Sequence, residues 1–315
     1  MSSYLVTGGA GFIGSHLVDA LVGRGDDVVV VDDLSNGSRE HVPAEAELVE
    51  ADVADAPSLE QAFQRRRFEA VLNVAGQASI AQSFAHPERD LRTNVTGTLN
   101  VITACIEHRV PRLVHASSMT VYGEPEAVPT PETAPCRPVS YYGVTKYAAE
   151  RYVHVAGART DVDLDVTSLR MFNVYGERQR LDNPYQGVLA IFMGNLLRGD
   201  PITIHSDGRQ TRDFVYVADV VDAWLRLLDD RGSRNRVYNV GSGRETPIAE
   251  LADAVLAGFG VSTDTHQVER APAQQGDLRR SGADVSALKS TGWRARTSFE
   301  DGMRRTIAWA RAASR

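Results

Sequence analysis

A glycine-rich segment begins where the first apolar run of the chain ends. Residues 4–6 read as a buried strand, and the segment TGGAGFIG (residues 7–14) follows directly and opens an amphipathic stretch. Gly8 permits a tight turn, Gly11 lets the backbone approach a phosphate, and Gly14 allows close packing of helix on strand. The helix N-terminus would then face a bound anion. The segment therefore predicts a phosphate-binding turn between a strand and a helix.

The next apolar run supplies the second part of a dinucleotide site. Residues 28–31 are four valines that end in Asp32, at about the 20-residue spacing expected for an acid that binds a ribose. Its carboxylate would bind the adenosine ribose and repel the extra phosphate of NADP, so NAD is the expected cofactor. The alternative is that Asp32 only caps the strand end or the following turn. Asp52 either holds the adenine edge or caps a helix that begins near Ser58.

Short β-branched runs alternate with amphipathic segments through the first half, which is typical of parallel strands joined by crossover helices. Strands are expected at 4–6, 28–31, 47–49, 70–74, 112–115, 164–169 and 237–241, and helices at 12–24, 58–65, after Pro87, and at 141–154, 188–197, 247–259 and 299–310. This pattern predicts an α/β fold, a doubly wound parallel (Rossmann) sheet with a smaller mixed α/β substrate domain. We expect residues 1–173 to form the NAD-binding domain, with return segments at about 212–245, and residues 174–315 to form mainly the substrate domain.

The charge balance argues against two classes of partner. Lys and Arg total 34 and Asp and Glu total 41, a net charge of −7 without a long basic block, so neither nucleic acid nor a membrane is expected. No apolar stretch approaches the roughly 18 residues of a membrane span, and no signal-peptide pattern opens the chain, so the predicted location is cytoplasmic. Cys105 and Cys136 are too few for a zinc site, and no metal is expected.

Two residues in the middle of the chain indicate acid–base chemistry. Tyr142 and Lys146 stand four residues apart at an expected helix start, and therefore on one face. The lysine, together with a bound nicotinamide cation, would favour the phenolate and turn a group with a reference pKa of about 10 into a usable base. Since the chain contains only two lysines, Lys146 and Lys289, chance pairing is a poor explanation.

Hydroxyl side chains follow the fifth expected strand. The segment HASSMTVYG (residues 115–123) lies at the carboxyl edge of the sheet, where ligands of such folds bind. The hydroxyls of Ser117, Ser118 and Thr120 are therefore candidates for hydrogen bonds to a substrate. The alternative is a serine-rich turn without such a role.

Together these residues resemble the extended short-chain dehydrogenase/reductase family, and within it the nucleotide-sugar 4-epimerases. The resemblance runs from residue 3 to about residue 310 and also includes NVAG (73–76), Asn94, RMFNVYG (170–176) and TRDFVYV (211–217). It implies that Tyr142 removes the proton of the sugar 4-hydroxyl while NAD takes the hydride from C4. The resulting 4-keto sugar then turns and takes the hydride back on its other face. The implied catalytic residues are Tyr142, Lys146 and Ser118.

The same resemblance implies binding roles. Lys146 would hold the nicotinamide ribose, Asn173 and Arg212 the diphosphate, and Val188 and His205 would lie near the base. The candidate cofactor-binding residues are Gly8, Gly11, Phe12, Ile13, Gly14, Asp32, Asn36, Asp52, Val53, Ala75, Asn94, Ser117, Tyr142 and Lys146. The candidate substrate-binding residues are Ser118, Thr120, Asn173, Arg180, Gly187, Val188, His205, Arg212 and Asp277. One departure is Gln274, where family members commonly carry an arginine for the diphosphate.

The resemblance also suggests a homodimer. The helix after Pro87 carries an apolar stripe of Leu91, Val95, Leu99, Ile102 and Ile106. Paired with the helix of Tyr142 across a two-fold axis, it would form a four-helix bundle. The alternative is that the stripe packs on the sheet within one subunit.

Sibling activities begin with the same oxidation and differ in the fate of the 4-keto sugar. In the 4,6-dehydratases the two positions before Val-Tyr-Gly resemble an Asp-Glu pair, and decarboxylases carry a Glu there, whereas this chain has Met119 and Thr120. Neither side chain can act as a carboxylate acid or base, so simple return of the hydride is favoured. The alternative of another class is a regulator that binds NAD without catalysis.

The identity of the sugar depends on the loop after the RMFNVYG segment. The run Arg178-Gln179-Arg180 resembles that of small bacterial UDP-glucuronate 4-epimerases, and Arg180 could pair with a C6 carboxylate. UDP-glucuronate to UDP-galacturonate is therefore the first expectation. UDP-glucose and UDP-N-acetylglucosamine stay open, the latter because Ser281 is small where some relatives that use neutral hexoses resemble a tyrosine.

Overall fold

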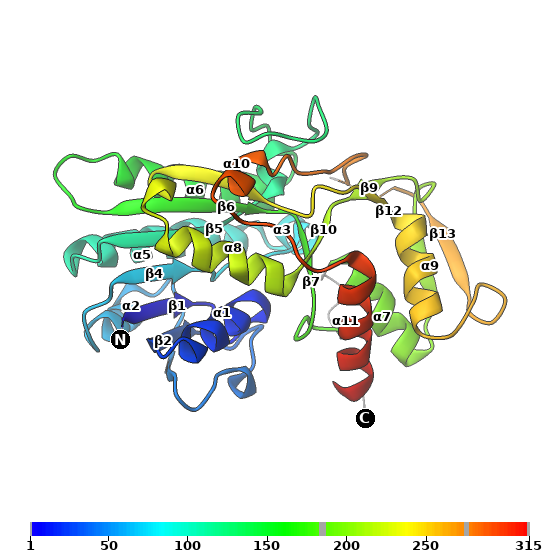
Figure 1. The fold of residues 1–315 in the computed structure, drawn as a ribbon, viewed down its shortest axis with the longest axis horizontal. Coiled ribbons are helices and arrows are strands. Elements are labelled where there is room, and N and C mark those ends of the chain that lie inside the picture. The colour runs from blue at the N-terminus through cyan, green and yellow to red at the C-terminus, as the bar shows by residue number, and fades with distance from the viewer. Residues whose placement is uncertain (1, 183–186, 274–276, 314–315) are drawn as a thin grey trace.

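The computed structural model describes residues 2–182, 187–273 and 277–313, and its centre is a seven-stranded sheet (Figure 1). The strand order is β11-β6-β5-β4-β1-β2-β3, and each neighbouring pair is parallel. The strands are β1 (Ser3–Thr7), β2 (Asp27–Asp32), β3 (Glu47–Glu50), β4 (Ala70–Asn73), β5 (Arg112–Ser118), β6 (Asp165–Met171) and β11 (Arg236–Val240). The predicted doubly wound Rossmann sheet is confirmed.

Helices cover both faces of this sheet because its strands are apolar on both sides. On one face, α1 (Phe12–Gly23), α8 (Val217–Asp229) and α10 (Ser286–Ser290) share a core with inward residues such as Val6 and Val30. On the other face, α2 (Ala56–Phe63), α5 (Gly97–Glu107) and α6 (Tyr141–Gly157) pack on Leu5 and Val29. Because successive side chains of a strand point to opposite faces, Leu5 packs in one core and Val6 in the other.

The long helix expected after Pro87 is interrupted. It consists of α4 (Pro87–Leu91), a π-helical turn (Arg92–Thr96) and α5, and it is preceded by the short α3 (Ile80–Ala85). A π-helical turn inserts one extra residue and re-aims the side chains that it carries, so a uniform 3.6-residue period does not describe this segment. Asn94 lies in this turn and is buried.

The smaller part of the protein lies to one side of the sheet, on the right in Figure 1. It contains the parallel pairs β7 (Asn173–Tyr175) with β10 (Phe214–Tyr216) and β8 (Ile202–His205) with β13 (Val268–Ala271), and the antiparallel pair β9 (Thr211–Arg212) with β12 (Thr246–Pro247). Helices α7 (Val188–Arg198), α9 (Ile248–Gly258) and α11 (Phe299–Ala313) enclose a separate apolar core. Between these elements the chain returns to the large sheet through α8 and β11.

Sequence reasoning overlooked several of these elements. Helix α8 buries Val217, Val220, Val221, Trp224 and Leu227 on one side, a helical period that could have been found. Strands β8 and β13 were missed because each is only four residues long and is bordered by a proline, Pro201 before β8 and Pro272 after β13. Short strands of this kind become recognisable only when a partner strand is known.

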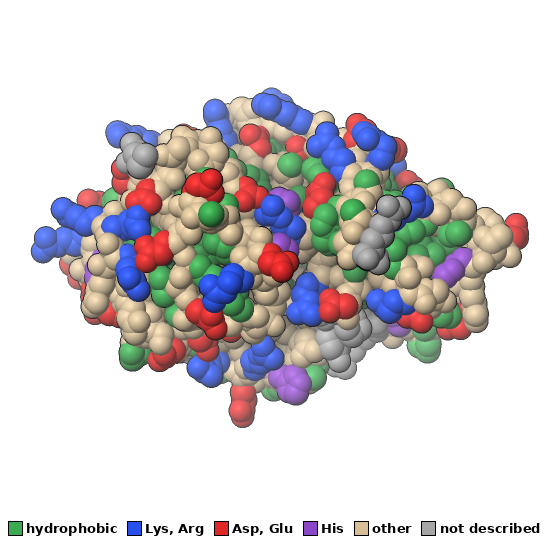
Figure 2. Space-filling model, turned by 90° about the horizontal axis from the view of Figure 1, so that it is seen from below, with side chains coloured by type: hydrophobic (Ala, Val, Ile, Leu, Met, Phe, Trp, Pro, Cys, Tyr) green, Lys and Arg blue, Asp and Glu red, His purple; other side chains and the backbone are tan. Residues whose placement is uncertain are grey.

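The surface is mixed in charge. Basic and acidic side chains are interspersed over the face shown in Figure 2, so the net negative charge is not gathered there. Within residues 2–182, 187–273 and 277–313, no helix is long and apolar enough to cross a membrane.

Candidate active site

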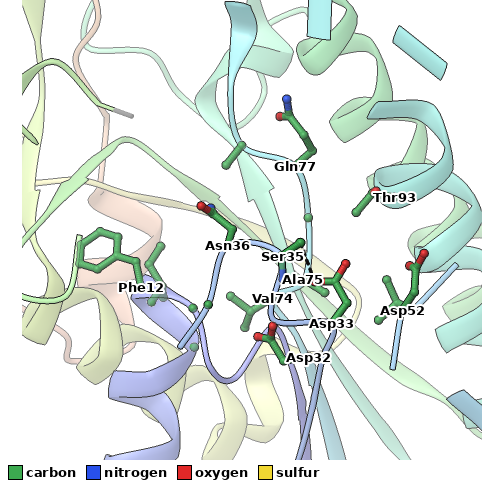
Figure 3. A pocket seen from close by; sticks show the side chains of 18 of the residues that line it. Phe12, Asp32, Asp33, Ser35, Asn36, Asp52, Val74, Ala75, Gln77 and Thr93 are labelled. Carbon is green, nitrogen blue, oxygen red and sulfur yellow. Dashed lines mark hydrogen bonds between the residues drawn. The ribbon is translucent and has the colours of Figure 1, made fainter. Parts of the chain in front are cut away.

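A cavity of about 660 Å³ opens at the carboxyl ends of β1, β2 and β4. This size is within the range of small-molecule and cofactor sites. Figure 3 shows Phe12 and Asp52 on opposite sides of it, with Asp32, Asn36 and Val74 between them. The predicted cofactor residues that line it are Gly8, Gly11, Phe12, Ile13, Gly14, Asp32, Asn36, Asp52, Val53 and Ala75. The structure thus brings most of the predicted cofactor residues to one cavity.

The glycine segment closes the end of this cavity. Gly8 has φ +68°, and a Cβ there would meet the Ala75 backbone at 2.8 Å. A Cβ at Gly14 would overlap the carbonyl oxygen of Gly8, so only glycine lets α1 approach the turn this closely. The N-cap residue Gly11 provides no side-chain cap, which leaves N–H donors of the first turn for an anion. The residues present therefore fit the pyrophosphate of NAD.

Asp32 lies at the end of β2 and is nearly completely buried. Its Oδ2 accepts a hydrogen bond from the Ala10 N–H at 2.9 Å, and its Oδ1 accepts one from the Leu34 N–H at 2.9 Å. Burial raises its pKa above the ordinary value. Asp32 does cap the turn after the strand, but it also lines the cavity, where each oxygen retains acceptor capacity for a ribose hydroxyl.

Asp52 occupies the opposite wall and is not a helix cap. Helix α2 begins at Ala56 with Asp55 as its N-cap residue, so the capping alternative for Asp52 is wrong. Its Oδ1 accepts from the Ala54 N–H at 2.8 Å, and its Oδ2 pairs with Arg92 at 2.9 Å. The carboxylate is thereby held at the wall of the cavity, and its contact with adenine stays a prediction.

The cavity is not lined by four of the predicted cofactor residues: Asn94, Ser117, Tyr142 and Lys146. Ser117 is buried and donates a hydrogen bond to Glu150 Oε2 at 2.6 Å. Asn94 accepts from the Gln77 N–H at 2.9 Å and donates to the Gln77 carbonyl at 3.1 Å. Gln77 itself lines the cavity. Asn94 therefore positions the loop that forms the wall, which motif reasoning could not distinguish from direct contact.

Ser118, Thr120 and Tyr142 form a cluster of hydroxyl groups. Ser118 ends β5, and its Oγ accepts a hydrogen bond from the Thr120 hydroxyl at 3.0 Å and interacts with the Tyr142 hydroxyl. Tyr142 is presented by the first turn of α6, which Ser140 caps through a 3.0 Å hydrogen bond from the Gly143 N–H. The structure therefore brings the hydroxyl of Tyr142 to the hydroxyl-rich segment that follows β5, two sites that the sequence had placed on separate elements.

Burial dominates the ionisation of this cluster. Burial raises the pKa of Tyr142 to about 12, the charge of Asp90 adds to this, and the hydrogen bond with Ser118 opposes it. Burial also lowers the pKa of Lys146 to about 8, against the charges of Asp90 and Glu150. Without a bound nicotinamide cation, desolvation keeps the Tyr142 hydroxyl protonated, and the role of Lys146 in favouring the phenolate stays a prediction. A bound nicotinamide cation is the remaining source of positive charge.

The predicted diphosphate residues lie in the smaller part of the protein. Arg212 is buried, forms an ion pair with Asp277 and donates to the Leu278 carbonyl at 2.8 Å. Asn173 lies across from Phe214 in the β7–β10 pair, and Phe214 follows Arg212 closely in the chain. In the described part of the chain its Oδ1 is buried without a hydrogen-bond partner. Gln274 lies outside the described residues.

The remaining predicted substrate residues line up along α7 and β8. Gly187 is the N-cap of α7 and Val188 its first residue, while His205 ends β8 with its Nδ1 2.9 Å from the Pro272 carbonyl. Arg180 lines the cofactor cavity and forms a bidentate pair with Asp182, at 3.0 and 2.7 Å. The guanidinium of Arg180, predicted to pair with a sugar carboxylate, thus pairs with the carboxylate of Asp182.

Sequence reasoning missed residues that complete the walls. The cavity is also lined by Gln77, Ser79, Gln82, His86, Arg89, Arg92 and Thr93. Four of these seven lie in α3, α4 and the π-helical turn, whose polar residues carry no motif of their own. Thr7 was missed too, although its Oγ1 accepts from the N–H groups of Val74 and Ala75 at 3.2 Å and so holds that loop.

Replacing Asp32 by Ala should weaken NAD binding by ~10- to 100-fold and reduce the discrimination against NADP, because charge-assisted hydrogen bonds and a repulsive charge are both lost. Calorimetric titration with each cofactor measures the two affinities. Asp26→Ala is the control, since Asp26 precedes β2 at the end away from the cavity, and its carboxylate pairs with Arg24 at 2.8 Å. An unchanged NAD to NADP preference in Asp32→Ala would show that another residue reads the ribose.

Comparison with known proteins identifies the family. Residues 4–241 match the NAD dependent epimerase/dehydratase family. The UDP-glucose 4-epimerase of Mycolicibacterium smegmatis is 39% identical over 319 aligned residues, covering 98% of this chain and 99% of that protein. The UDP-glucose 4-epimerase of Thermotoga maritima, solved with UDP-glucose, is 38% identical with a TM-score of 0.94, covering 99% of this chain and 100% of that one.

A third relative is informative about ligands. MoeE5, solved with UDP-glucose and NAD, is 34% identical with a TM-score of 0.88 and coverage of 99% of both chains. It has also been solved with UDP-glucuronic acid and NAD. NAD is the cofactor that the cavity described above accommodates. With its glycine turn, its Tyr142–Lys146 helix and a family match over most of its length, the chain belongs to the NAD dependent epimerase/dehydratase family, among its nucleotide-sugar 4-epimerases.

Proposed function

We propose that this nucleotide-sugar 4-epimerase acts on a neutral hexose and interconverts UDP-glucose and UDP-galactose. The observation that carries the reaction type is the cluster of Ser118, Thr120 and Tyr142, which contains hydroxyl groups beside a buried lysine. A second observation, the pairing of Arg180 with Asp182, supports a sugar without a carboxylate. The relatives named as UDP-glucose 4-epimerases agree with this choice.

The protein residues supply positioning and proton transfer. Bound NAD supplies the chemistry of accepting and returning a hydride at C4 of the sugar. The Tyr142 oxygen takes the 4-hydroxyl proton as C4 is oxidised and returns it when the ketone is reduced. Ser118, which is within hydrogen-bonding reach of Tyr142, orients the same hydroxyl. Lys146, held one turn further along α6, provides a positive charge that favours the ionised tyrosine once the nicotinamide is in place.

Residues 119 and 120, where related dehydratases and decarboxylases carry carboxylates, hold no acid or base in this chain. Thr120 donates to Ser118, and Met119 is buried against Ser281, with the Oγ of Ser281 3.7 Å from the Met119 sulfur. Neither group can release water from the 4-keto sugar or protonate a carbanion. Return of the hydride is then the step that this site supports. The alternative of a regulator without catalysis has no support, because Tyr142, Ser118 and Lys146 are all present.

A uronate is the second candidate substrate. UDP-glucuronate was the first expectation from the sequence, and Arg180 does lie at the cavity rim. To bind a C6 carboxylate, its guanidinium would have to leave Asp182 or share it. The structure of MoeE5 with UDP-glucuronic acid keeps this alternative open for the present chain.

The N-acetylated sugar has weaker support. The sequence argument for UDP-N-acetylglucosamine was the small side chain at Ser281. In the structure Ser281 is 2% exposed and Met119 is 9% exposed, so the methionine fills the space that a small residue would leave. Close-packed interiors leave little room for an additional acetamido group.

We also propose a cytoplasmic homodimer built on α4, α5 and α6. In the described part of the chain, the exposed large hydrophobic residues all lie on or beside these helices: Leu91, Leu99, Val139, Tyr141, Val144, Tyr152 and Val155. Ile102 of the predicted stripe instead packs on the sheet within the subunit. Because α4 and α5 both pack against α6, these exposed apolar side chains lie on adjoining helices, which supports an interface there.

Changing Tyr142 to Phe should lower kcat by ~100-fold or more, because the ring remains but the proton acceptor is lost. The rate of UDP-galactose formation from UDP-glucose measures this. Tyr141→Phe, on the same turn but with an exposed ring, should retain full activity. Near-normal turnover in Tyr142→Phe would exclude the proposed acid–base role.

The kcat/KM values for UDP-glucose, UDP-glucuronate and UDP-N-acetylglucosamine should rank in favour of UDP-glucose. Arg180→Ala should leave the value for UDP-glucose nearly unchanged, as should the control Arg159→Ala, which removes a similar Arg-x-Asp pair far from the cavity. A higher kcat/KM for UDP-glucuronate that falls ~10- to 100-fold in Arg180→Ala, but not in Arg159→Ala, would show that the substrate is the uronate and not the hexose.

Light scattering at micromolar concentration should give the mass of a dimer. Val155→Arg places a charge in the middle of the apolar face and should yield a folded monomer. A monomeric mass for the unchanged protein would exclude the proposed interface.

A further inference from the structure

Asp90 of α4 is a completely buried carboxylate that neither the sequence motifs nor the reaction described above uses. Its Oδ2 accepts a hydrogen bond from the Thr145 hydroxyl at 2.5 Å, and its Oδ1 accepts one from Asn94 Nδ2 at 3.2 Å. Within the described residues no ion pair shorter than 4.0 Å joins Asp90 to a cation. Burial raises the pKa of Asp90, while the hydrogen bond from Thr145 and the charge of Lys146 oppose this. The charged form of Asp90 therefore depends on a cation at longer range.

The charges around Lys146 indicate which carboxylate offsets which cation. Lys146 follows Thr145 on α6, and a Cβ added at Gly76 would lie 3.7 Å from Lys146 Nζ and 2.9 Å from the Oδ1 of Asn94, the residue that donates to Asp90. Two carboxylates, Asp90 and Glu150, act on the charge of Lys146. Glu150 already forms a buried pair with Arg170 at 2.6 Å and accepts from Ser117. Its negative charge is therefore matched by Arg170. Asp90 is left as the carboxylate without another cation, and Lys146 as the cation without another carboxylate.

We propose that Asp90 is the buried counter-charge of Lys146, a positioning residue that keeps this lysine in its charged form beside Tyr142. The proposal deepens the proposed function, because it rests on the role of Lys146 there. Asp90 does not touch the cofactor cavity, so its effect on the chemistry is exerted through Lys146 alone.

A hydrogen-bonded chain holds Asp90 in this place and connects it to the cavity wall. The amide nitrogen of Asn94 shares its two hydrogens among three acceptors: Asp90, the Thr145 oxygen at 3.1 Å and the Gln77 carbonyl. Asn94 reaches all three because the π-helical turn directs it inward. The same side chain thus fixes the carboxylate, the residue next to Lys146 and the loop that lines the cofactor cavity.

The groups that face Lys146 from the neighbouring elements define the electrostatic balance. Tyr142 and Glu150 lie on α6, Asp90 on α4, and His115 on β5. Burial holds the pKa of His115 well below its usual value, so this imidazole is neutral. α3 carries no titratable residue, Arg92 of the π-helical turn is paired with Asp52, and Tyr122 lies against Arg170.

Removing the Asp90 charge has a predictable sign. Asp90 raises the pKa of Lys146 and also raises the pKa of Tyr142. Asp90→Asn should therefore lower both, so that Lys146 loses its proton at a lower pH and Tyr142 ionises at a lower pH. A change that only damages packing would reduce activity at every pH without moving either limb.

The first experiment measures the pH profile of kcat from pH 6 to 10 for the holoenzyme. Both limbs should move to lower pH in Asp90→Asn, the alkaline limb by about one unit, as expected for loss of a nearby opposite charge. As the pH is raised, the amount of NAD that stays bound per protein after gel filtration should begin to fall at a lower pH in Asp90→Asn than in the unchanged protein. Glu88→Gln removes an exposed carboxylate of the same helix and should not move the limbs. Unmoved limbs and unchanged NAD retention in Asp90→Asn would overturn the proposal.

The second experiment is a double-mutant cycle in unfolding free energy at saturating NAD, which is independent of turnover. Asp90→Asn should destabilise the unchanged protein, but it should stabilise Lys146→Met, in which Asp90 has lost its cation. Equal effects of Asp90→Asn in both backgrounds would show that the two charges do not interact. The two claims can fail separately. If Asp90→Asn has equal effects in both backgrounds while Tyr142→Phe is inactive, only the role of Asp90 is rejected. If Tyr142→Phe is active, the proposed function is rejected.

Discussion

The close approach of α1 to the turn after β1 is the constraint on which the site depends. A side chain at residue 14 would overlap the Gly8 carbonyl oxygen, and one at residue 8 would meet Ala75 at the end of β4. Because both positions are glycine, the uncapped N-terminus of α1 faces the cavity at the edge where three parallel strands end. The anion site, the loop after β4 and the carboxylate of Asp32 are all placed relative to this contact.

A second set of contacts attaches the catalytic helix to the sheet. Glu150 of α6 pairs with Arg170 of β6 and accepts a hydrogen bond from Ser117 of β5. Burying such a pair costs desolvation, and removing one partner from a buried pair typically costs about 3–5 kcal/mol. The pair therefore does more for geometry than for net stability: it fixes α6 against the strand that carries Ser118. Tyr142 and Ser118 meet because of this attachment.

Much of the fold was predictable because its signals are local. The valines before Asp32 and the alternation of short apolar runs with amphipathic segments predicted β2 and the parallel sheet, and the structure has both. The π-helical turn at Arg92–Thr96 was not predictable, because its extra residue is stabilised by contacts of Asn94 with Gln77 and Thr145, which are distant in sequence. Strands β8 and β13 escaped for the same reason, since each depends on the other.

The sequence by itself determined which chemical groups are available. It placed glycines at 8, 11 and 14, an acid at 32, a tyrosine and a lysine one helical turn apart, and no carboxylate at 119 or 120. Only the tertiary structure decided how those groups ionise and pair. Burial raises the pKa of Tyr142 and lowers that of Lys146, and the space beside Ser281 is filled by Met119. Desolvation and pairing depend on what surrounds a group in space, and residues far apart in the chain supply those surroundings.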